Sequence, residues 1–273
     1  MFKIGEVKIK KTLQKSKISE YCINPYFGCL NGCLYCYASF IMQKWHHKND
    51  LWGNFVDVRI NSVENLKKEL RNKNNIEIYI SSMTDPYQIV EEKYKLTREI
   101  LKTFLSEENS LFDKKFKITI QTKRDLVLRD LDILKDLKDI TVGLTITILD
   151  DEKRKIFEKG ASGAIKRLKT LEILNKNNIK TYAFFGPILP KISDSDEVIY
   201  KIIKNIYETG TKEILFDKLS YFKYMERFKK TIFSLNLYDY FINSDDKNYL
   251  IELKKRILDI TKEFKDLNYK ILF

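Results

Sequence analysis

The sequence predicts an α/β fold in which a parallel sheet is flanked by helices. Short apolar segments rich in β-branched residues alternate with longer segments whose apolar residues recur at helical spacing. Repeated strand–helix units of this kind are typical of a parallel sheet with helices outside it. The length of 273 residues suits one large domain or two small ones, and the hydrophobic content of 44% is enough for a sizeable core.

Six strands are predicted. The segments IEIYIS and FKITIQT have the β-branched composition of buried strands. The first strand contains Pro25, which must end its ladder early, and the fifth ends at Gly186 and Pro187. In chain order, the predicted strands cover residues 21–27, 76–81, 116–122, 140–148, 179–185 and 213–216.

Helices are predicted between these strands and after the last one. A helix over 37–47 follows a cysteine-rich loop, and Ser62 is the predicted N-cap of the next helix. Ser193 and Asp196 form the predicted capping pair of the helix before the last strand. Beyond about Lys218 the chain is predicted to be a helical extension that packs on the core. The apolar positions at helical spacing are Val63, Leu66 and Leu70; Leu96, Ile100 and Phe104; Leu131, Leu134 and Leu137; Ile165, Leu168, Leu171 and Leu174; and Leu250, Leu253, Ile257, Ile260 and Phe264.

Charge and composition narrow the class of protein. Lysine and arginine number 50 against 38 aspartates and glutamates, so the formal net charge is +12. This charge permits an anionic partner such as nucleic acid, but it is also typical of the charged surfaces of proteins from hot environments, and both interpretations stay open. We expect a cytoplasmic protein without a membrane segment, because the chain lacks a long apolar window and a secretion signal. We also expect it to be a monomer or weak oligomer. Its four cysteines do not resemble a disulfide framework, which fits a reducing compartment.

Three of these cysteines lie in one loop, within NPYFGCLNGCLYCYAS at residues 24–39. Cys29, Cys33 and Cys36 have the spacing C-x3-C-x2-C. Three thiolates at this spacing can hold three irons of a [4Fe–4S] cluster and leave the fourth iron open to a small molecule. Structural zinc usually requires a fourth protein ligand and a second cysteine pair, which the sequence lacks.

The motif CxxxCxYC resembles the signature of radical S-adenosylmethionine (SAM) enzymes, and TDPYQ at residues 84–88 resembles their spore photolyase-related branch. This resemblance implies a partial (β/α)6 TIM-like barrel over residues 1–217, with the helical extension over 218–273. It also implies a [4Fe–4S] cluster whose open iron binds SAM. An electron from a ferredoxin- or flavodoxin-like donor would then cleave SAM to a 5′-deoxyadenosyl radical for hydrogen abstraction.

Candidate SAM contacts lie after the predicted strands, because ligands of parallel α/β folds sit at the carboxyl ends of strands. Many radical SAM enzymes carry a GGE-like motif after the second strand, where this chain has SSMTDPYQ instead. By position in the spore photolyase-related branch, a lysine and several hydroxyls contact SAM. Two tyrosines beside the last cysteine are expected to pack the adenine and shield the cluster. These residues are Lys123; Thr84 or Ser82; Thr145 or Thr147; and Tyr35 and Tyr37.

Each assignment has a structural alternative. TDPYQ is also an ordinary turn sequence, Lys123 also suits a solvated helix start, and the two threonines also suit a strand.

Glu158 and Arg167 resemble positions at which the branch carries SAM- or substrate-binding residues. The adjacent histidines His46 and His47, Arg124 and Lys191, and Cys22 are further polar or reactive residues near these segments.

We expect His46 and His47 to be exposed helix-end residues rather than metal ligands, and Arg124 and Lys191 to lie at the open face of the barrel. Cys22 is expected to be a buried small side chain; the alternatives are a hydrogen-atom donor or a ligand of a second metal.

The predicted function is therefore that of a radical SAM enzyme with an unidentified substrate, and nucleic acid is one possible partner. The alternatives are a nucleic-acid lesion lyase like spore photolyase, a non-catalytic iron–sulfur protein and a zinc-stabilised nucleic-acid-binding module. Spore photolyase returns a hydrogen atom from a cysteine after its second strand, whereas residues 81–85 here contain none. No equivalent of its lesion-binding hairpin is recognisable after Lys218. The sequence therefore predicts SAM cleavage without repair of spore-type thymine dimers.

Overall fold

A computed structural model describes residues 2–42, 47, 49–110, 114–220 and 225–273. Its main feature is an eight-stranded sheet with the order β11-β10-β9-β8-β7-β6-β3-β2. All neighbours from β3 to β11 are parallel, and only β2 is antiparallel to its neighbour β3. The bounds are β2 Gln14–Lys15, β3 Tyr21–Ile23, β6 Ile76–Ile80, β7 Phe116–Thr122, β8 Asp139–Thr145, β9 Lys180–Ile188, β10 Glu213–Lys218 and β11 Asn268–Ile271.

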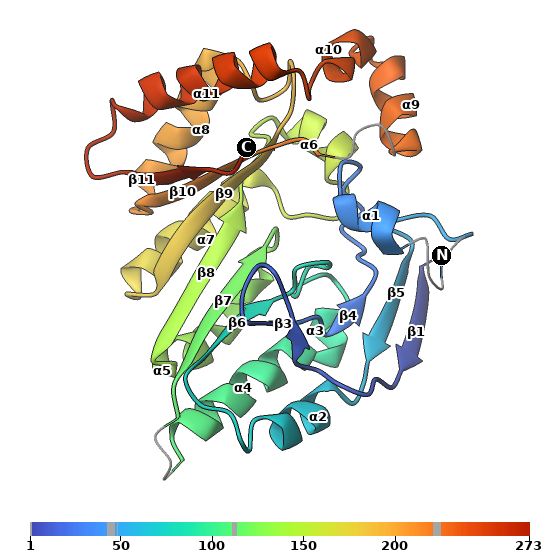
Figure 1. Cartoon of the computed structure of the whole chain (residues 1–273), viewed down its shortest axis with the longest axis vertical. Coiled ribbons are helices and arrows are strands. Elements are labelled where there is room, and N and C mark those ends of the chain that lie inside the picture. Colours follow the sequence, from blue (N-terminus) through green and yellow to red (C-terminus); the bar gives the residue numbers. More distant parts are fainter. Residues whose placement is uncertain (1, 43–46, 48, 111–113, 221–224) are drawn as a thin grey trace.

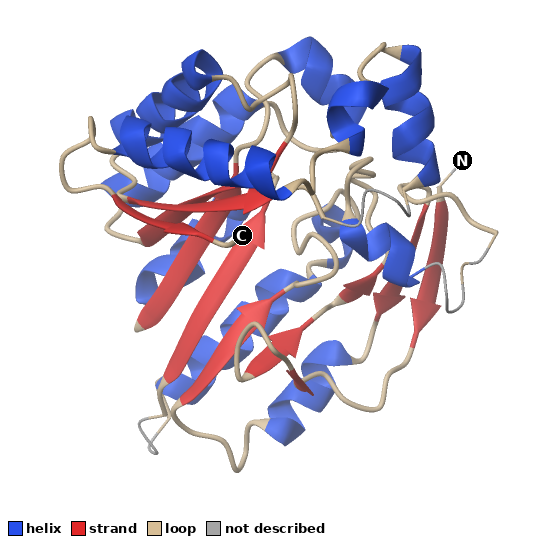
Figure 2. Cartoon of the chain, turned by 45° about the horizontal axis from the view of Figure 1, so that its top comes forward, coloured by secondary structure: helices blue, strands red, loops and turns tan. Residues whose placement is uncertain are grey.

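Helices cover the outer face of this curved, open sheet, as Figures 1 and 2 show. The predicted partial (β/α)6 barrel is confirmed, with β3, β6, β7, β8, β9 and β10 as its six strands. The helices are α1 Tyr37–Met42, α2 Ser62–Glu69, α3 Glu91–Tyr94, α4 Leu96–Glu108, η1 Asp125–Asp130, α5 Leu131–Asp136, α6 Asp151–Phe157, α7 Ala164–Lys176, α8 Asp196–Glu208, α9 Glu226–Ser234, α10 Tyr238–Ile242 and α11 Lys247–Thr261.

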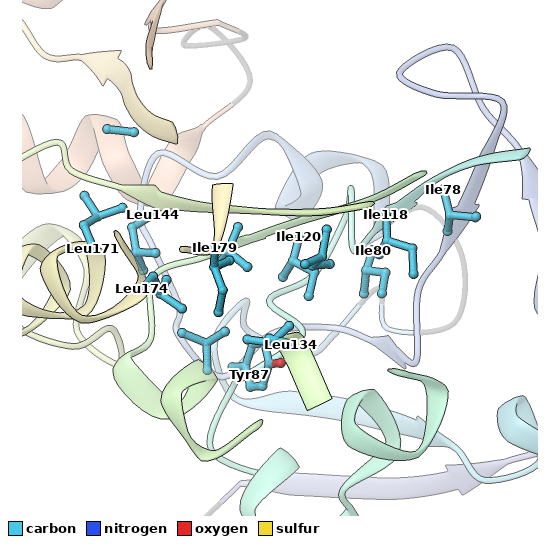
Figure 3. Close-up of a cluster of buried hydrophobic side chains, with 14 of the residues drawn as sticks. Ile78, Ile80, Tyr87, Ile118, Ile120, Leu134, Leu144, Leu171, Leu174 and Ile179 are labelled. Atoms are coloured by element: carbon cyan, nitrogen blue, oxygen red, sulfur yellow. The ribbon is translucent and has the colours of Figure 1, made fainter. Parts of the chain in front are cut away.

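The strands alternate between two environments, because successive side chains point to opposite faces of a sheet. Ile78 and Ile80 of β6, their counterparts on β7 and the leucines of α5 and α7 belong to one buried hydrophobic cluster (Figure 3). Each such buried aliphatic side chain contributes about 1.5–3 kcal/mol to stability. The intervening residues, such as Tyr79 of β6 and Gln121 of β7, face the inside of the barrel, where a cavity lies.

A second, three-stranded sheet lies beside β3, near one end of the main sheet, and was not predicted (Figure 1). It has the order β1-β5-β4, with β1 at Lys3–Val7, β5 at Phe55–Arg59 and β4 at Tyr26–Phe27. The predicted strand 21–27 is therefore wrong as one element, since it divides into β3 and β4 of different sheets. Pro25, which has no N–H to donate to a ladder, stands at this division.

The predicted helix starts also need correction. Asn61, not Ser62, precedes α2; the Ser62 hydroxyl lies in the first turn and donates to the Arg59 carbonyl at 2.7 Å. Ser195, not Ser193, caps α8 by accepting from the Val198 N–H. Ser193 accepts instead from the Leu189 N–H at 2.9 Å and so stabilises the preceding turn.

The chain after Lys218 forms α9, α10 and α11 and then returns as β11, a strand that the sequence analysis did not predict. Leu253, Ile257 and Ile260 of α11 join the main core, whereas Phe228 and Ile232 of α9 pack in a cluster with Cys33 and Tyr35. No helix in the described part of the chain is long and apolar enough to cross a membrane.

Candidate active site

The three clustered cysteines line one cavity of about 420 Å³ at the carboxyl ends of the barrel strands. Cys29 and Cys33 are buried, and Cys36 is partly buried. Across the described residues, no three His, Cys, Asp or Glu side chains converge as ligands of a single metal ion would. A [4Fe–4S] cluster uses one cysteine for each of several irons, so its cysteines stand further apart than zinc ligands do.

Asp85 of the TDPYQ segment ties the cysteine loop to the ends of two strands. Its carboxylate accepts from Asn31 Nδ2 at 2.8 Å, from Thr122 Oγ1 at 2.6 Å and from the Lys123 N–H at 2.8 Å. Ionised acceptors form hydrogen bonds about twice as strong as neutral ones. The segment is thus more than an ordinary turn, because Asp85 fixes the loop, β7 and Lys123 relative to one another.

Gln88 of the same segment holds the loop backbone. Its Oε1 accepts from the Leu30 N–H at 2.8 Å, and its Nε2 donates to the Gly28 carbonyl at 3.2 Å and to Thr84 Oγ1 at 2.8 Å. Thr84 Oγ1 in turn donates to the Gly28 carbonyl at 2.6 Å. The amide and the hydroxyl therefore satisfy buried loop groups that would otherwise lose their partners on leaving water.

Two glycines allow the loop to approach its neighbours. Gly28 has φ of 91°, and a Cβ there would lie 2.6 Å from the Phe55 carbonyl oxygen. A Cβ on Gly160, which follows α6, would lie 2.4 Å from the Leu30 carbonyl oxygen. The Gly160 N–H donates to the Asn31 carbonyl at 2.9 Å. The segment after α6 therefore also holds the loop, at Leu30 and Asn31.

A buried ion pair contacts the cysteine loop through Tyr35. Tyr35 donates its hydroxyl to the Glu158 carboxylate, which also pairs with Arg167. Burial opposes ionisation of Glu158, but the charges of Arg167 and Lys123 lower its pKa below the ordinary value. Arg167 Nη1 also donates to the Thr145 carbonyl at 2.7 Å. Glu158 and Arg167 are fully buried and do not line the cavity, and their contacts are with Tyr35 of the loop and Thr145 of β8.

Burial also affects the pKa values of the three cysteine thiols. It raises the pKa of Cys29 to about 12 and raises the pKa values of Cys33 and Cys36 as well. The charge of Lys123 opposes the rise at Cys33 and Cys36. Iron bound at these thiols would therefore have to displace their protons, which is usual for cysteine ligands.

The other predicted cofactor residues mostly surround the same cavity. Lys123 lines it, with Nζ 5.7 Å from the centroid of the Tyr35 ring. Thr147 does not line the cavity. Its buried hydroxyl donates instead to the Gly186 carbonyl at 2.9 Å. The predicted residues that do line it are Tyr35, Tyr37, Ser82, Thr84, Lys123 and Thr145.

Two further polar side chains, to which the sequence analysis assigned no SAM contact, also line this cavity. Ser81 Oγ and Trp52 Nε1 are buried and have no hydrogen-bond partner within the part of the chain described. Ser81 also has φ of 69°, in the left-handed region that favours glycine. Buried groups without partners are costly, so a bound ligand that satisfies them is the simplest explanation. The position of Ser81 at the end of a predicted strand made it a candidate from the sequence, whereas no sequence signal indicated Trp52.

His47 is buried, which makes the prediction of an exposed residue wrong. Its ring stacks on Phe55 at 4.0 Å between centroids, and its nitrogens contact Asp50 at 2.6 Å and Asp57 at 3.0 Å. The two carboxylates satisfy both nitrogens, which is why burial is possible. His46 lies outside the described residues.

The remaining predicted residues do not line the cavity. Cys22 is buried, as expected, but its Sγ lies 3.1 Å from Ser82 Oγ, so only one side chain separates it from the cavity. Arg124 is directed to protein, since Nη1 donates to the Gly160 carbonyl at 2.8 Å. Lys191 is exposed, with Nζ 4.8 Å from the centroid of the Tyr240 ring.

Comparisons with known proteins identify the family. The profile of the Radical SAM superfamily matches residues 23–206. An uncharacterized protein of Methanocaldococcus jannaschii is 40% identical over 199 residues, 72% of this chain and 71% of that protein. An uncharacterized protein of Mycobacterium tuberculosis is 25% identical over 201 residues, which are 70% of this chain but only 56% of that protein. The chain belongs to the radical SAM superfamily and is an enzyme of that class.

Solved structures confirm the fold. Spore photoproduct lyase complexed with dinucleoside spore photoproduct matches 99% of this chain and 82% of its own, with a TM-score of 0.70 and 13% identity. Streptococcus suis SuiB bound to S-adenosylmethionine matches 92% of this chain and 50% of its own, with a TM-score of 0.60 and 15% identity. The predicted likeness to the spore photolyase branch is thus confirmed at the level of the fold.

Proposed function

We propose that this protein holds a [4Fe–4S] cluster through Cys29, Cys33 and Cys36 and reductively cleaves SAM. The observation that carries the proposal is that these cysteines open into the same cavity as the polar ends of β6, β7 and β8. When bound, the cluster supplies an electron at its open iron, and cleavage of SAM there yields the 5′-deoxyadenosyl radical that abstracts hydrogen from a substrate.

The chain's own residues position SAM and exclude water. Lys123 supplies a positive charge for the SAM carboxylate, and the hydroxyls of Ser82 and Thr145 suit its amine and ribose. Thr84 contributes through the loop, because its hydroxyl is engaged by Gly28 and Gln88. Tyr35 and Tyr37 pack the adenine and shield the cluster.

The direct test is anaerobic reconstitution of the whole chain with iron and sulfide, followed by assay for 5′-deoxyadenosine with SAM and dithionite. Formation of 5′-deoxyadenosine supports the proposal. A cluster that forms without any SAM cleavage would support the iron–sulfur carrier instead, and zinc in place of iron would support the nucleic-acid-binding module.

Replacing Lys123 by alanine is expected to weaken SAM binding about ten- to a hundred-fold, because it removes a charge-assisted contact of roughly 1.5–3 kcal/mol. Equilibrium binding of SAM to the reconstituted protein measures the effect, and the cluster spectrum without SAM should not change. Lys117→Ala is the control, since Lys117 lies on the same strand but is exposed and pairs with Glu77. Equal SAM affinity in the two variants would exclude the role of Lys123.

The proposal also includes an electron donor and candidate substrates. A ferredoxin- or flavodoxin-like donor in a reducing cytoplasm would supply the electron. Among proteins of similar fold, spore photoproduct lyase was solved with a dinucleoside spore photoproduct and SuiB with the precursor peptide SuiA. The net charge of +12 favours delivery of a polyanion such as nucleic acid to the enzyme's surface, which keeps a nucleic-acid lesion as a second candidate substrate.

We expect no repair of spore-type thymine dimers. Ser82 lines the cavity after β6, and its O–H bond is too strong to quench a carbon radical as a thiol does. The measurement is restoration of thymines in a dinucleoside spore photoproduct incubated with reconstituted enzyme, SAM and reductant, with spore photoproduct lyase as the positive control. Efficient repair would contradict this expectation and would give the donor role to Cys22, next to Ser82, or to buried Tyr87.

A further inference from the structure

The half of the cavity away from the cysteines has its own chemistry. Strand alternation directs Tyr79 of β6, Gln121 of β7, Tyr182 and Phe184 of β9 and Asp217 of β10 into it. None of these side chains belongs to the residues proposed to hold the cluster or SAM. This half of the cavity is therefore available to the substrate.

Its aromatic wall is fixed in place. Tyr79 and Tyr182 both donate to Gln121 Oε1, at 2.6 Å and 3.0 Å. Gly143 leaves room for the Tyr182 ring, because a Cβ there would lie 2.1 Å from it. These contacts occupy the acceptor of Gln121 and hold both rings in the wall of the cavity.

Asp217 is the one carboxylate on this wall within the described chain. Gly186 gives it space, since a Cβ there would come within 3.0 Å of Asp217 Cβ and 2.4 Å of the Phe184 ring. Its only hydrogen bond in the described segments is from the Lys218 N–H at 2.9 Å. The Lys218 ammonium pairs instead with exposed Asp245 at 2.7 Å. No described cation lies within ion-pair distance of Asp217.

A half-buried carboxylate without an ion-pair contact is costly. Burial raises the pKa of Asp217, and the hydrogen bond and charge of Lys218 offset this rise only in part. A ligand that brings a positive charge would remove this cost. Aromatic faces attract cations as well, and most strongly where water is excluded. A phosphate or carboxylate group would meet repulsion at the same place.

We propose that this end of the cavity binds a cationic ammonium or guanidinium group of the substrate. Asp217 accepts the N–H bonds of that cation, and the rings of Tyr182 and Phe184 line the path of the group that carries it. The inference rests on the proposed function, since it makes this site the substrate half of the SAM cavity. It assigns the substrate a basic group, close to the atom that loses hydrogen.

The test uses three matched probes on the whole reconstituted chain with SAM bound: n-butylguanidinium, n-butylammonium and neutral n-butylurea. Isothermal titration calorimetry should show saturable binding of at least one cation and none of the urea, and the two cations distinguish guanidinium from ammonium. Asp217→Asn should weaken cation binding about ten-fold or more, as loss of a charged hydrogen bond does. Asp245→Asn, which changes the exposed partner of Lys218, is the control and should bind within about two-fold of wild type.

The inference would be overturned by an absence of saturable cation binding, by equal binding of butylurea, or by full cation binding in Asp217→Asn. Loss of SAM affinity in Asp217→Asn would also overturn it, because Asp217 would then belong to the SAM half. Calorimetry separates this inference from the proposed function. A protein that cleaves SAM but binds neither cation refutes only the inference, whereas a protein that forms no 5′-deoxyadenosine refutes the proposed function.

Discussion

Alanine at Cys29, Cys33 or Cys36 is expected to abolish both the brown iron–sulfur colour and SAM cleavage. Each substitution removes one of three thiolates, and the described loop offers no further cysteine as a replacement. Absorbance and iron content after anaerobic reconstitution, with 5′-deoxyadenosine as the activity readout, measure the loss. The fold should persist, because the main hydrophobic core lies on the opposite face of the sheet.

Cys22→Ala is the matched control for these variants. Cys22 is buried like Cys29, but it contacts Ser82 and Asn24 and does not line the cavity. Its replacement should leave the iron content unchanged. A colourless Cys22→Ala protein beside a brown variant of one of the other three would refute the ligand assignment.

The sequence predicted the parts of the structure that repeat or that carry rare residues. The isoleucines of β6 and β7 have a period of two and face a core, so their strands were predictable to within a residue. The spacing of the three clustered cysteines likewise indicated that they lie in one loop. The role of TDPYQ was harder to predict, because Asp85 acts through Asn31, Thr122 and Lys123, which are distant in sequence.

Elements that depend on distant partners were missed. β1 is largely exposed, and Gly5 interrupts its pattern while leaving room for Asp57 of β5. β11 has almost no buried residues, and its pairing with β10 brings together segments far apart in sequence. Asp217 gave no signal for the same reason: a single acidic residue at a strand end becomes informative only when the cations around it are known.

Glu158→Gln is expected to lower the free energy of unfolding by about 3–5 kcal/mol, the usual cost of breaking a buried ion pair. The substitution leaves the fully buried Arg167 charged and without its carboxylate partner. Urea unfolding of the protein without cluster measures the change. Glu172→Gln is the control: Glu172 lies on α7 like Arg167 but pairs with exposed Lys169 and Lys176, and such surface pairs contribute about 0–1 kcal/mol.

The double variant Glu158→Gln, Arg167→Met separates the cost of an unpaired charge from the cost of altered packing. Removing both charges should recover most of the lost stability, because no uncompensated ion then remains in the core. Cluster retention should recover less, since a neutral glutamine is a weaker acceptor for Tyr35 and methionine no longer donates to the Thr145 carbonyl. If Glu158→Gln costs no more than Glu172→Gln, the ion pair does not stabilise the fold. If the double variant regains stability and also holds the cluster as well as wild type, the pair has no part in positioning the cysteine loop.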